Sequence, residues 1–354
     1  MFYCGLDIAM KSSYLYITDS EGKKLAAGEV ATEKSTLTAR LKPYVRGGLR
    51  VAIEAGNQTA WIHDHLVSLG AQVTVVNPTK VKLIAESRCK TDKIDAKILC
   101  ELLRLNGLPH PVHMPDKPAR ALRGLLVARR QLVSARVKLC NVVRGMVRQE
   151  AIRLPAAALS SMVGWKRLLA GGFEQPHLVV VVSAYFESFK SLTASIRQLN
   201  QELAERERTD TRAARLKTIP RVGRIAALTF LAAVDDVHRF GSSRKLVGYS
   251  GLAPTVRSSG ERTEYGSISR VGRRELRAVW VQIGHLVAID KKKPTAPLRN
   301  WFAKVAHRRG RKTAIVALAR RLLVIAYHLL KEETVYDPAR LKRKRAASKK
   351  KLEG

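Results

Sequence analysis

The sequence predicts an α/β amino-terminal domain followed by a mostly helical remainder. Short apolar, strand-like runs separated by turn residues fill much of the first eighty residues, and apolar residues recur at helical spacing after residue 118. The two parts also differ in charge. Residues 1–110 hold 15 Lys and Arg against 11 Asp and Glu, whereas the remainder holds 50 against 18.

The 354-residue chain carries a formal net charge of +36, far more than solubility requires. We therefore expect a polyanion, and above all a nucleic acid, as its partner. Its four cysteines, Cys4, Cys89, Cys100 and Cys140, lack the C-x-x-C spacing of zinc sites and argue against a disulfide framework. With no signal pattern and no apolar run long enough to span a bilayer, we expect a soluble, cytoplasmic and nucleoid-associated protein without a membrane partner.

The order of the predicted elements indicates a mixed sheet flanked by helices. Three strands come first, and then helices and strands alternate; the expected ranges are strands at 2–9, 12–18 and 24–31, a helix at 33–41, a strand at 49–53, a helix at 59–69 and a strand at 72–76. A further helix opens at Asn77-Pro78. This order suits a ribonuclease-H-like sheet.

Four acidic residues stand out in this part. Asp7 lies inside the first apolar strand, where an unpaired carboxylate is costly, and Glu54 ends a neighbouring strand. Asp92 and Asp95 are three positions apart at the start of a helix, and therefore share one face. An isolated pair of this kind is also typical of a solvated helix start. Four carboxylates from two strands and a helix could converge on one or two Mg²⁺ ions, with Mn²⁺ as the alternative.

Three segments carry these acids: Gly5-Leu6-Asp7-Ile8-Ala9, Ile53-Glu54-Ala55-Gly56-Asn57 and Lys90-Thr91-Asp92-Lys93-Ile94-Asp95-Ala96. Taken together, they resemble the DEDD transposases of bacterial insertion sequences. The resemblance implies a RuvC-like domain in which the four acids bind the metal. It also implies recombination guided by a structured non-coding RNA, the bridge or seek RNA.

The middle of the chain is predicted to be helical. From Pro118 to Arg148 an apolar stripe is surrounded by basic residues, and no acid occurs between Asp116 and Glu150. This composition favours a phosphate-contacting helix over a plain solvated face. Residues 183–216 have the spacing of a long helix or coiled-coil arm that could pair protomers.

The stretch Thr218-Ile219-Pro220-Arg221-Val222-Gly223-Arg224 resembles the turn of helix-hairpin-helix modules, in which glycine lets backbone N–H groups approach a phosphate. A simple turn between two helices is the alternative interpretation. The two arginines beside the glycine favour phosphate contact.

A second resemblance to the same transposases begins at Gly248. Their carboxy-terminal domain has a Gly-Leu-x-Pro segment followed by Ser-Gly, and that serine attacks DNA. Here the match is Gly251-Leu252-Ala253-Pro254 followed by Ser259-Gly260, with Ser258 as the rival nucleophile. The residue types alone predict only a loop turn at this position.

Several basic residues are expected to contact nucleic-acid phosphates, because Arg and Lys side chains donate charge-assisted hydrogen bonds. These residues are Lys90, Arg129, Arg136, Arg221, Arg224, Arg270, Arg273, Arg274, Arg308 and Arg309.

We expect four segments: a RuvC-like domain at 1–150 ending in a long basic helix, a helical coiled-coil arm at 151–214, a mostly helical transposase domain at 215–334 and a basic tail at 335–354. The resemblance predicts an RNA-guided DNA recombinase with a covalent phosphoserine intermediate. Its partners would be target and donor double-stranded DNA, a structured guide RNA and further copies of itself, as a dimer or tetramer with active sites shared between protomers. The alternatives are a RuvC-like Holliday-junction nuclease that acts by hydrolysis and a non-catalytic RNA- or DNA-binding protein.

Overall fold

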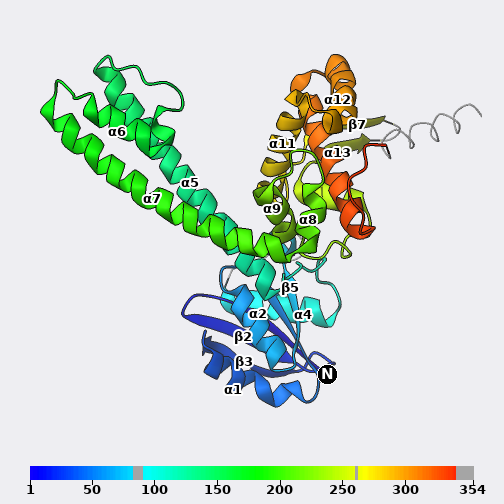
Figure 1. The fold of residues 1–354 in the computed structure, drawn as a ribbon. Helices are drawn as coiled ribbons and strands as arrows, with labels where there is room; N and C mark the ends of the chain where they lie inside the picture. The colour runs from blue at the N-terminus through cyan, green and yellow to red at the C-terminus, as the bar shows by residue number, and fades with distance from the viewer. Residues whose placement is uncertain (83–90, 260–261, 340–354) are drawn as a thin grey trace, which may run out of the picture. The chain divides into compact units, whose positions relative to one another are not determined.

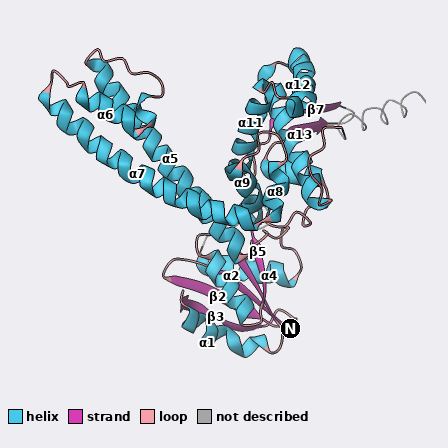
Figure 2. Cartoon of the chain, viewed as in Figure 1, coloured by secondary structure: helices cyan, strands magenta, loops and turns pink. Residues whose placement is uncertain are grey.

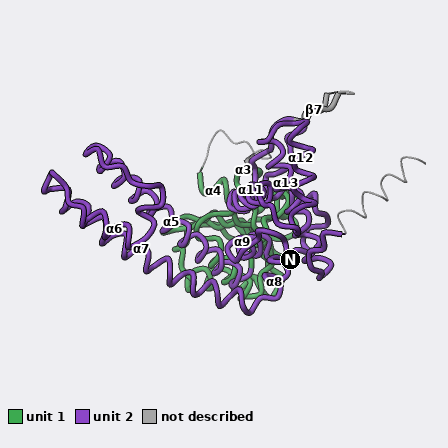
Figure 3. Tube along the Cα trace, turned by 45° about the horizontal axis from the view of Figure 1, so that its top comes forward, with its two compact units in different colours: residues 1–115 green, residues 116–354 purple. Residues whose placement is uncertain are grey.

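The computed structural model describes residues 1–82, 91–259 and 262–339. The chain forms two compact units, Met1–Pro115 and Asp116–Gly354, which are coloured green and purple in Figure 3. The long basic helix that follows Asp116 belongs to the second unit.

The first unit is built on a five-stranded mixed sheet (Figure 2, magenta). Its strands are β1 (Phe2–Asp7), β2 (Ser12–Thr18), β3 (Lys24–Ala31), β4 (Leu49–Glu54) and β5 (Gln72–Val76), in the order β3-β2-β1-β4-β5. The first three strands are antiparallel to one another, whereas β4 runs parallel to both β1 and β5. The predicted mixed sheet flanked by helices is therefore confirmed, and it is consistent with a RuvC-like fold.

Both faces of this sheet are covered by helices. On one face, α1 (Lys34–Val45) and α2 (Thr59–Ser68) pack against alternate residues of the central strands, including Leu6 and Ile53, which are fully buried. On the other face lie α3 (Pro78–Lys82) and α4 (Asp92–Arg104), which pack around Ala52 and Val76. Burial on two faces explains why the central strands are apolar in continuous runs rather than in alternation.

The α4 helix lies unusually close to β1 because residue 5 is glycine. A Cβ atom on Gly5 would lie 2.0 Å from Ala96 O and 2.6 Å from Cys100 N, distances that no side chain can occupy. The Cys100 thiol donates to Tyr3 O at 3.2 Å. Since Cys100 lies over Tyr3 and Ala96 lies over Gly5, α4 runs antiparallel to β1, and its first turn lies toward the carboxyl end of that strand.

We expect the substitution Gly5→Ala to destabilise the first unit by about 3 kcal/mol or more, because the contacting atoms are backbone and cannot rotate away. Thermal or denaturant unfolding of the purified chain measures the change. Gly124→Ala is the matched control, because that glycine lies in a helix with open space around it, and alanine there should be neutral or stabilising. An unchanged midpoint for Gly5→Ala would contradict the close packing of α4.

The second unit begins with two long helices, α5 (Lys117–Gln149) and α7 (Pro176–Thr209), which lie side by side and run antiparallel (Figure 1). A short 3₁₀ turn, η1 (Ala158–Ser160), and α6 (Met162–Ala170) join them at their far end. There the fully buried Trp165 packs between Phe186 and Phe189, with ring centroids 5.7 and 5.3 Å away. This aromatic cluster closes the end of the helix pair.

The helix predicted at 183–216 is in fact two helices. It starts earlier, at Pro176, since proline suits the first helical position, and it stops at Thr209. The carboxylate of Asp210 then accepts a hydrogen bond from Arg212 N and caps a second helix, α8 (Thr211–Lys217). Leu203 near the end of α7 and Leu216 of α8 pack in the same core, so the apolar spacing did not mark the break.

The rest of the second unit, as far as the structure describes it, is a helical bundle with one hairpin. Its helices are α9 (Arg224–Val234), α10 (Ser243–Ser250), α11 (Arg274–Ile289), the 3₁₀ turn η2 (Lys293–Thr295), α12 (Ala296–Arg309) and α13 (Arg311–Lys331). The hairpin pairs β6 (Pro254–Ser259) with β7 (Arg262–Ile268). All these helices surround one core that includes the fully buried Trp280 and Phe230.

Two helices in the described residues, α7 and α13, have the length and mean hydropathy of a membrane span. The most apolar window of α13 is 56% buried inside the bundle. A core helix of a helical protein passes the same test, so this feature is weak evidence for a membrane.

Candidate active site and nucleic-acid surfaces

Asp7 and Glu54 are the last residues of two neighbouring parallel strands, β1 and β4. Leu6 pairs with Ile53, so the next position on each strand is one of the two acids. The carboxyl ends of parallel strands meet at one edge of a sheet, which brings the two residues side by side.

Both acids lie on the sheet face that α4 covers. Side chains alternate between faces along a strand, so Asp7 shares the face of Gly5, and Glu54 shares the face of Ala52. Gly5 contacts the α4 backbone, and Ala52 packs in the α4 cluster. The alternation therefore places both carboxylates on the same side, toward the first turn of α4.

The loops that follow the two strands are tied together. Gln58 Nε2 donates to Ala9 O at 3.0 Å and to Met10 O at 3.2 Å, which links the loop after β4 to the loop after β1. The Thr59 hydroxyl donates to Glu54 O at 2.9 Å and accepts from a backbone N–H of the same turn. These bonds fix the sheet edge at which the acids lie.

Asp92 and Asp95 occupy the first turn of α4. The helix begins there because Thr91 caps it, with its hydroxyl accepting from Ile94 N at 3.3 Å. Because α4 runs antiparallel to β1, this turn lies at the same sheet edge as Asp7 and Glu54. The backbone thus brings all four predicted acids to one edge.

The four acids offer only carboxylate oxygens as metal ligands, and these suit Mg²⁺ or Mn²⁺. Water and phosphate would fill the remaining coordination positions of the ion. Asp7, Glu54 and Asp95 each interact with other groups of the protein in the present arrangement. Within residues 1–82, 91–259 and 262–339, no group of three or more His, Cys, Asp or Glu side chains is close enough to hold a metal ion. The backbone brings the four acids to one edge, and their side chains would have to turn toward an ion to ligate it. Lys90 lies outside the described residues.

Ser259 is the final residue of β6 in the second unit, and its backbone pairs with Arg262 of β7. The serine therefore ends a strand instead of lying in an irregular loop. Its side chain and that of Ser258 lie outside the part of the chain that the structure describes.

Arg129 and Arg136 of α5 both face α7. Arg129 Nε donates to Asn200 Oδ1 at 2.6 Å. The guanidinium of Arg136 lies over the Phe189 ring, 5.8 Å from its centroid, and donates to Thr193. These two arginines hold the helix pair together, so a phosphate contact by either one stays a prediction and would compete with these bonds.

Arg221, in the turn between α8 and α9, and Arg224, the first residue of α9, are both paired with buried acids. Arg221 Nε donates to Asp290 Oδ2 at 2.7 Å, and the hydrogen bond lowers the pKa of Asp290. Arg224 donates to Glu207, which also accepts from Lys217. A phosphate bound at this turn would therefore compete with two internal ion pairs.

Glu207 is only 9% exposed, and it joins α7, α8 and α9. Burial alone would raise its pKa, but the hydrogen bonds from Lys217 and Arg224 outweigh burial and leave the pKa below its ordinary value. A lowered pKa in the folded state means that the ionised carboxylate stabilises the fold. This stabilisation is present above the unfolded pKa of about 4.3 and is lost as the pH falls through the folded pKa.

We expect Glu207→Gln to lower the thermal unfolding midpoint at pH 7 by roughly 5 °C, since two cations lose their buried partner. Below about pH 4 the difference from the unsubstituted chain should shrink, because its own carboxylate becomes protonated. Thermal melts at several pH values measure this effect. The control, Glu205→Gln, removes an exposed acid that pairs with Arg208 and should change little. Equal effects of both substitutions would contradict the assigned role of Glu207.

The remaining predicted phosphate contacts lie in the bundle. Arg273 Nε donates to the Tyr249 hydroxyl at 2.9 Å, whereas Arg274 begins α11 and is exposed. Arg308 and Arg309 are exposed at the end of α12. Arg270 lies at the rim of a cavity beside the hairpin.

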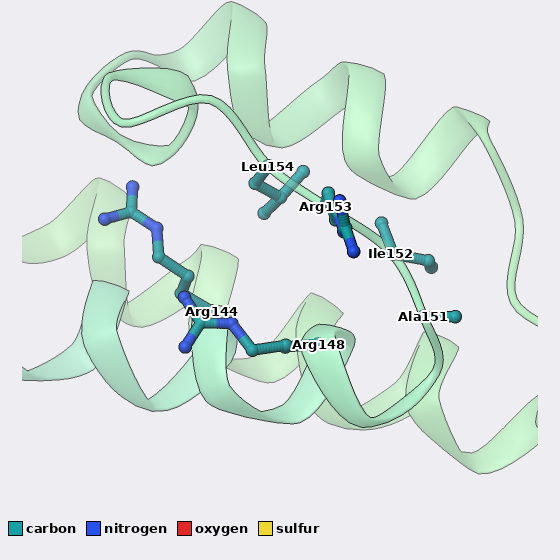
Figure 4. Close-up of a pocket in the computed structure, with 6 residues that line it drawn as sticks. All are labelled: Arg144, Arg148, Ala151, Ile152, Arg153 and Leu154. Atoms are coloured by element: carbon teal, nitrogen blue, oxygen red, sulfur yellow. The ribbon is translucent and has the colours of Figure 1, made fainter.

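A basic pocket of about 570 Å³ lies at the far end of the α5–α7 pair (Figure 4). Arg144 and Arg148 project from α5, and Arg153 comes from the segment that follows it; the other lining residues carry no charge. Arg144 Nη2 donates to Ala156 O at 2.7 Å, and its Nε is buried without a hydrogen-bond partner in the described structure. The basic stripe of α5 pointed to two of these arginines, whereas nothing in the sequence marked Arg153.

Two transposase families match separate parts of the chain. The family described as "Transposase", of the DEDD IS110 type, matches residues 4–151, and the "Transposase IS116/IS110/IS902 family" matches residues 213–299. The two matches together cover more than half of the chain, and the first includes all four acids. The second includes Ser259.

Similar proteins come from several bacteria. The chain is 26% identical to the transposase for insertion sequence element IS1111A of Coxiella burnetii, over 94% of this chain and 90% of that protein. It is 26% identical to the transposase for IS1328 of Yersinia enterocolitica, over 94% and 98%. It is also 27% identical to the pilin gene-inverting protein of Moraxella bovis, over 85% and 86%. With both family matches, these similarities show that the chain belongs to the DEDD transposases of the IS110/IS116 family.

Proposed function

We propose that this chain is an insertion-sequence recombinase that cuts and rejoins DNA through a covalent phosphoserine intermediate. Asp7, Glu54, Asp92 and Asp95 would hold Mg²⁺ against the scissile phosphate, and Ser259 would be the nucleophile. The observation that carries the proposal is the arrangement of the four acids, which two strand ends and one helix start bring to a single sheet edge.

When bound, a divalent cation polarises the phosphate and offsets negative charge on the attacking and leaving oxygens. In the proposed step, Ser259 Oγ forms a bond to phosphorus, and the phosphodiester bond to the departing strand breaks. The hydroxyl proton passes through solvent to the leaving oxygen. The serine ester keeps the bond energy for joining to a new strand, whereas hydrolysis would lose it to water.

The similar proteins include transposases and a pilin gene-inverting protein. Their names support recombination, rather than simple cleavage, as the proposed activity. The excess of 32 positive charges on residues 111–354 supports double-stranded DNA and a structured guide RNA as partners. We propose further that the four segments 1–150, 151–214, 215–334 and 335–354 are functional divisions of the chain. We also propose that the chain assembles as a dimer or tetramer in the bacterial cytoplasm.

RNA guidance is tested by purifying the chain from cells that carry the complete insertion sequence and sequencing the RNA that co-purifies. A single defined structured RNA is the expected result, and a random mixture would overturn RNA guidance. The same preparation is then incubated with Mg²⁺ and DNA that contains the ends of the element. Cleavage is expected, whereas binding without cleavage would favour a non-catalytic nucleic-acid-binding protein.

A further inference from the structure

A cavity of about 760 Å³ lies beside the hairpin of the second unit, between β7, α12 and α13. Its floor is largely apolar and its rim is cationic. The floor residues include Leu252, Ile268, Val316, Ala317 and Val324, and the cations are Arg270, Lys312, Arg320 and Arg321. None of the lining residues that the structure describes is acidic. An apolar floor with a cationic rim suits a ligand that joins a flat ring to a phosphate.

Arg270 is held at this rim in a strained backbone conformation, with φ at 57°. Arg277 Nη1 donates to Arg270 O at 3.0 Å. The neighbouring Gly272 packs so closely on Tyr249 O that a Cβ atom there would lie 2.2 Å away. A left-handed conformation at a residue other than glycine persists only where the surroundings impose it. The loop that presents Arg270 is therefore rigidly built.

The wall of the cavity contains an aromatic ring and a guanidinium that stack together. Arg321 lies over the indole of the half-buried Trp301, 4.7 Å from its centroid. Nucleobases stack on aromatic rings and on guanidinium planes, and such stacking does not depend strongly on the identity of the base. This pair offers a base a flat surface next to the cations of the rim.

We propose that the cavity binds one unpaired nucleotide of single-stranded DNA. The base rests on the floor and against the wall formed by Trp301, and its phosphate lies between Arg270, Lys312 and Arg320. A base in an intact duplex cannot enter, because it is stacked and paired. The smaller pocket of Arg144, Arg148 and Arg153 lacks an aromatic wall and suits a phosphate alone.

This inference rests on the proposed function, since it places the nucleotide relative to the attacked phosphate. Pro254, at the start of β6, lines the cavity, and Ser259 ends the same strand five residues later. At the rise of a β-strand, the two are about 17 Å apart. The cavity would therefore hold a nucleotide a few positions from the phosphate that Ser259 attacks, where strand exchange must separate the two DNA strands.

The test measures binding of the full chain to two fluorescent oligonucleotides of six nucleotides, one of thymidylates and one abasic, in EDTA and at fixed salt. The unsubstituted chain should bind the thymidylate oligonucleotide about tenfold more tightly than the abasic one. Ala317→Phe fills the floor without changing the charge and should abolish this preference. Lys312→Gln with Arg320→Gln should weaken binding of both oligonucleotides by about tenfold.

The control is Lys291→Gln with Arg311→Gln, which removes two exposed cations that do not line the cavity and should keep the tenfold preference. Thermal melts establish that each variant folds. Equal binding of the two oligonucleotides by the unsubstituted chain, or an undiminished preference in Ala317→Phe, would overturn the inference. Because EDTA prevents metal-dependent cleavage, a failure here leaves the proposed function intact, and a chain that cannot cleave DNA can still show the base preference.

Discussion

Substitution of Asp7 by alanine is expected to lower the rate of Mg²⁺-dependent DNA cleavage by about a thousandfold or more. Asp7 and Glu54 end adjacent parallel strands, so the loss of either carboxylate removes a ligand from the centre of the proposed metal site. A thousandfold loss corresponds to about 4 kcal/mol of transition-state stabilisation, within the range that a metal ion supplies. Single-turnover cleavage of an end-containing DNA substrate, with guide RNA present, measures the effect.

The matched control for this prediction is Glu21→Gln, which removes an exposed acid from the turn between β2 and β3, at the opposite edge of the same sheet. Its cleavage rate should stay within about twofold of the unsubstituted rate, since it lies away from the carboxyl ends of β1 and β4. Binding of DNA by Asp7→Ala should be retained or improved, because one negative charge is removed from a surface that meets phosphates. Substantial cleavage by Asp7→Ala would show that the acids at this edge are not catalytic.

Ser259→Ala is expected to abolish both cleavage and protein-linked DNA, with a rate loss of at least about a thousandfold, because alanine has no atom that can attack phosphorus. The covalent product is detected by electrophoresis of radiolabelled DNA in detergent, with and without protease. The unsubstituted chain should yield a labelled species of protein size that protease releases.

Ser258→Ala serves as the control at the neighbouring position of the same strand and should retain cleavage and the covalent product. If Ser258→Ala abolishes the adduct and Ser259→Ala does not, the nucleophile is Ser258. If both variants still cut DNA without any adduct, the enzyme hydrolyses DNA in the manner of a junction resolvase.

The sheet could be predicted from sequence because its strands are short, apolar and separated by clear turns. The expected strand at 24–31 is confirmed at both ends, and the expected helix at 59–69 differs by one residue. The position of the four acids along these elements was predictable for the same reason. Their common edge could be inferred only once the pairing of β1 with β4 and the direction of α4 were known.

Other features depend on contacts between distant residues, and local patterns carry no information about them. The basic turn at 218–224 looks like a free phosphate site, but Arg221 is paired with Asp290 and Arg224 with Glu207. The sequence of residues 151–175 has no clear pattern that predicts its structure. Its Trp165 packs against Phe186 and Phe189 of α7, which lie outside this segment. The cavity beside the hairpin is likewise assembled from β7, α12 and α13, which no single motif joins.

The central claim is that carboxylates from β1, β4 and α4 bind one divalent metal centre, and titration with Mn²⁺ tests it most directly. Calorimetric titration of the full chain should give saturable binding that is lost or weakened at least about tenfold in Asp7→Asn, Glu54→Gln and Asp92→Asn, but kept in Glu21→Gln. Mn²⁺ binding that is unchanged in all three variants would show that these acids form no common metal site.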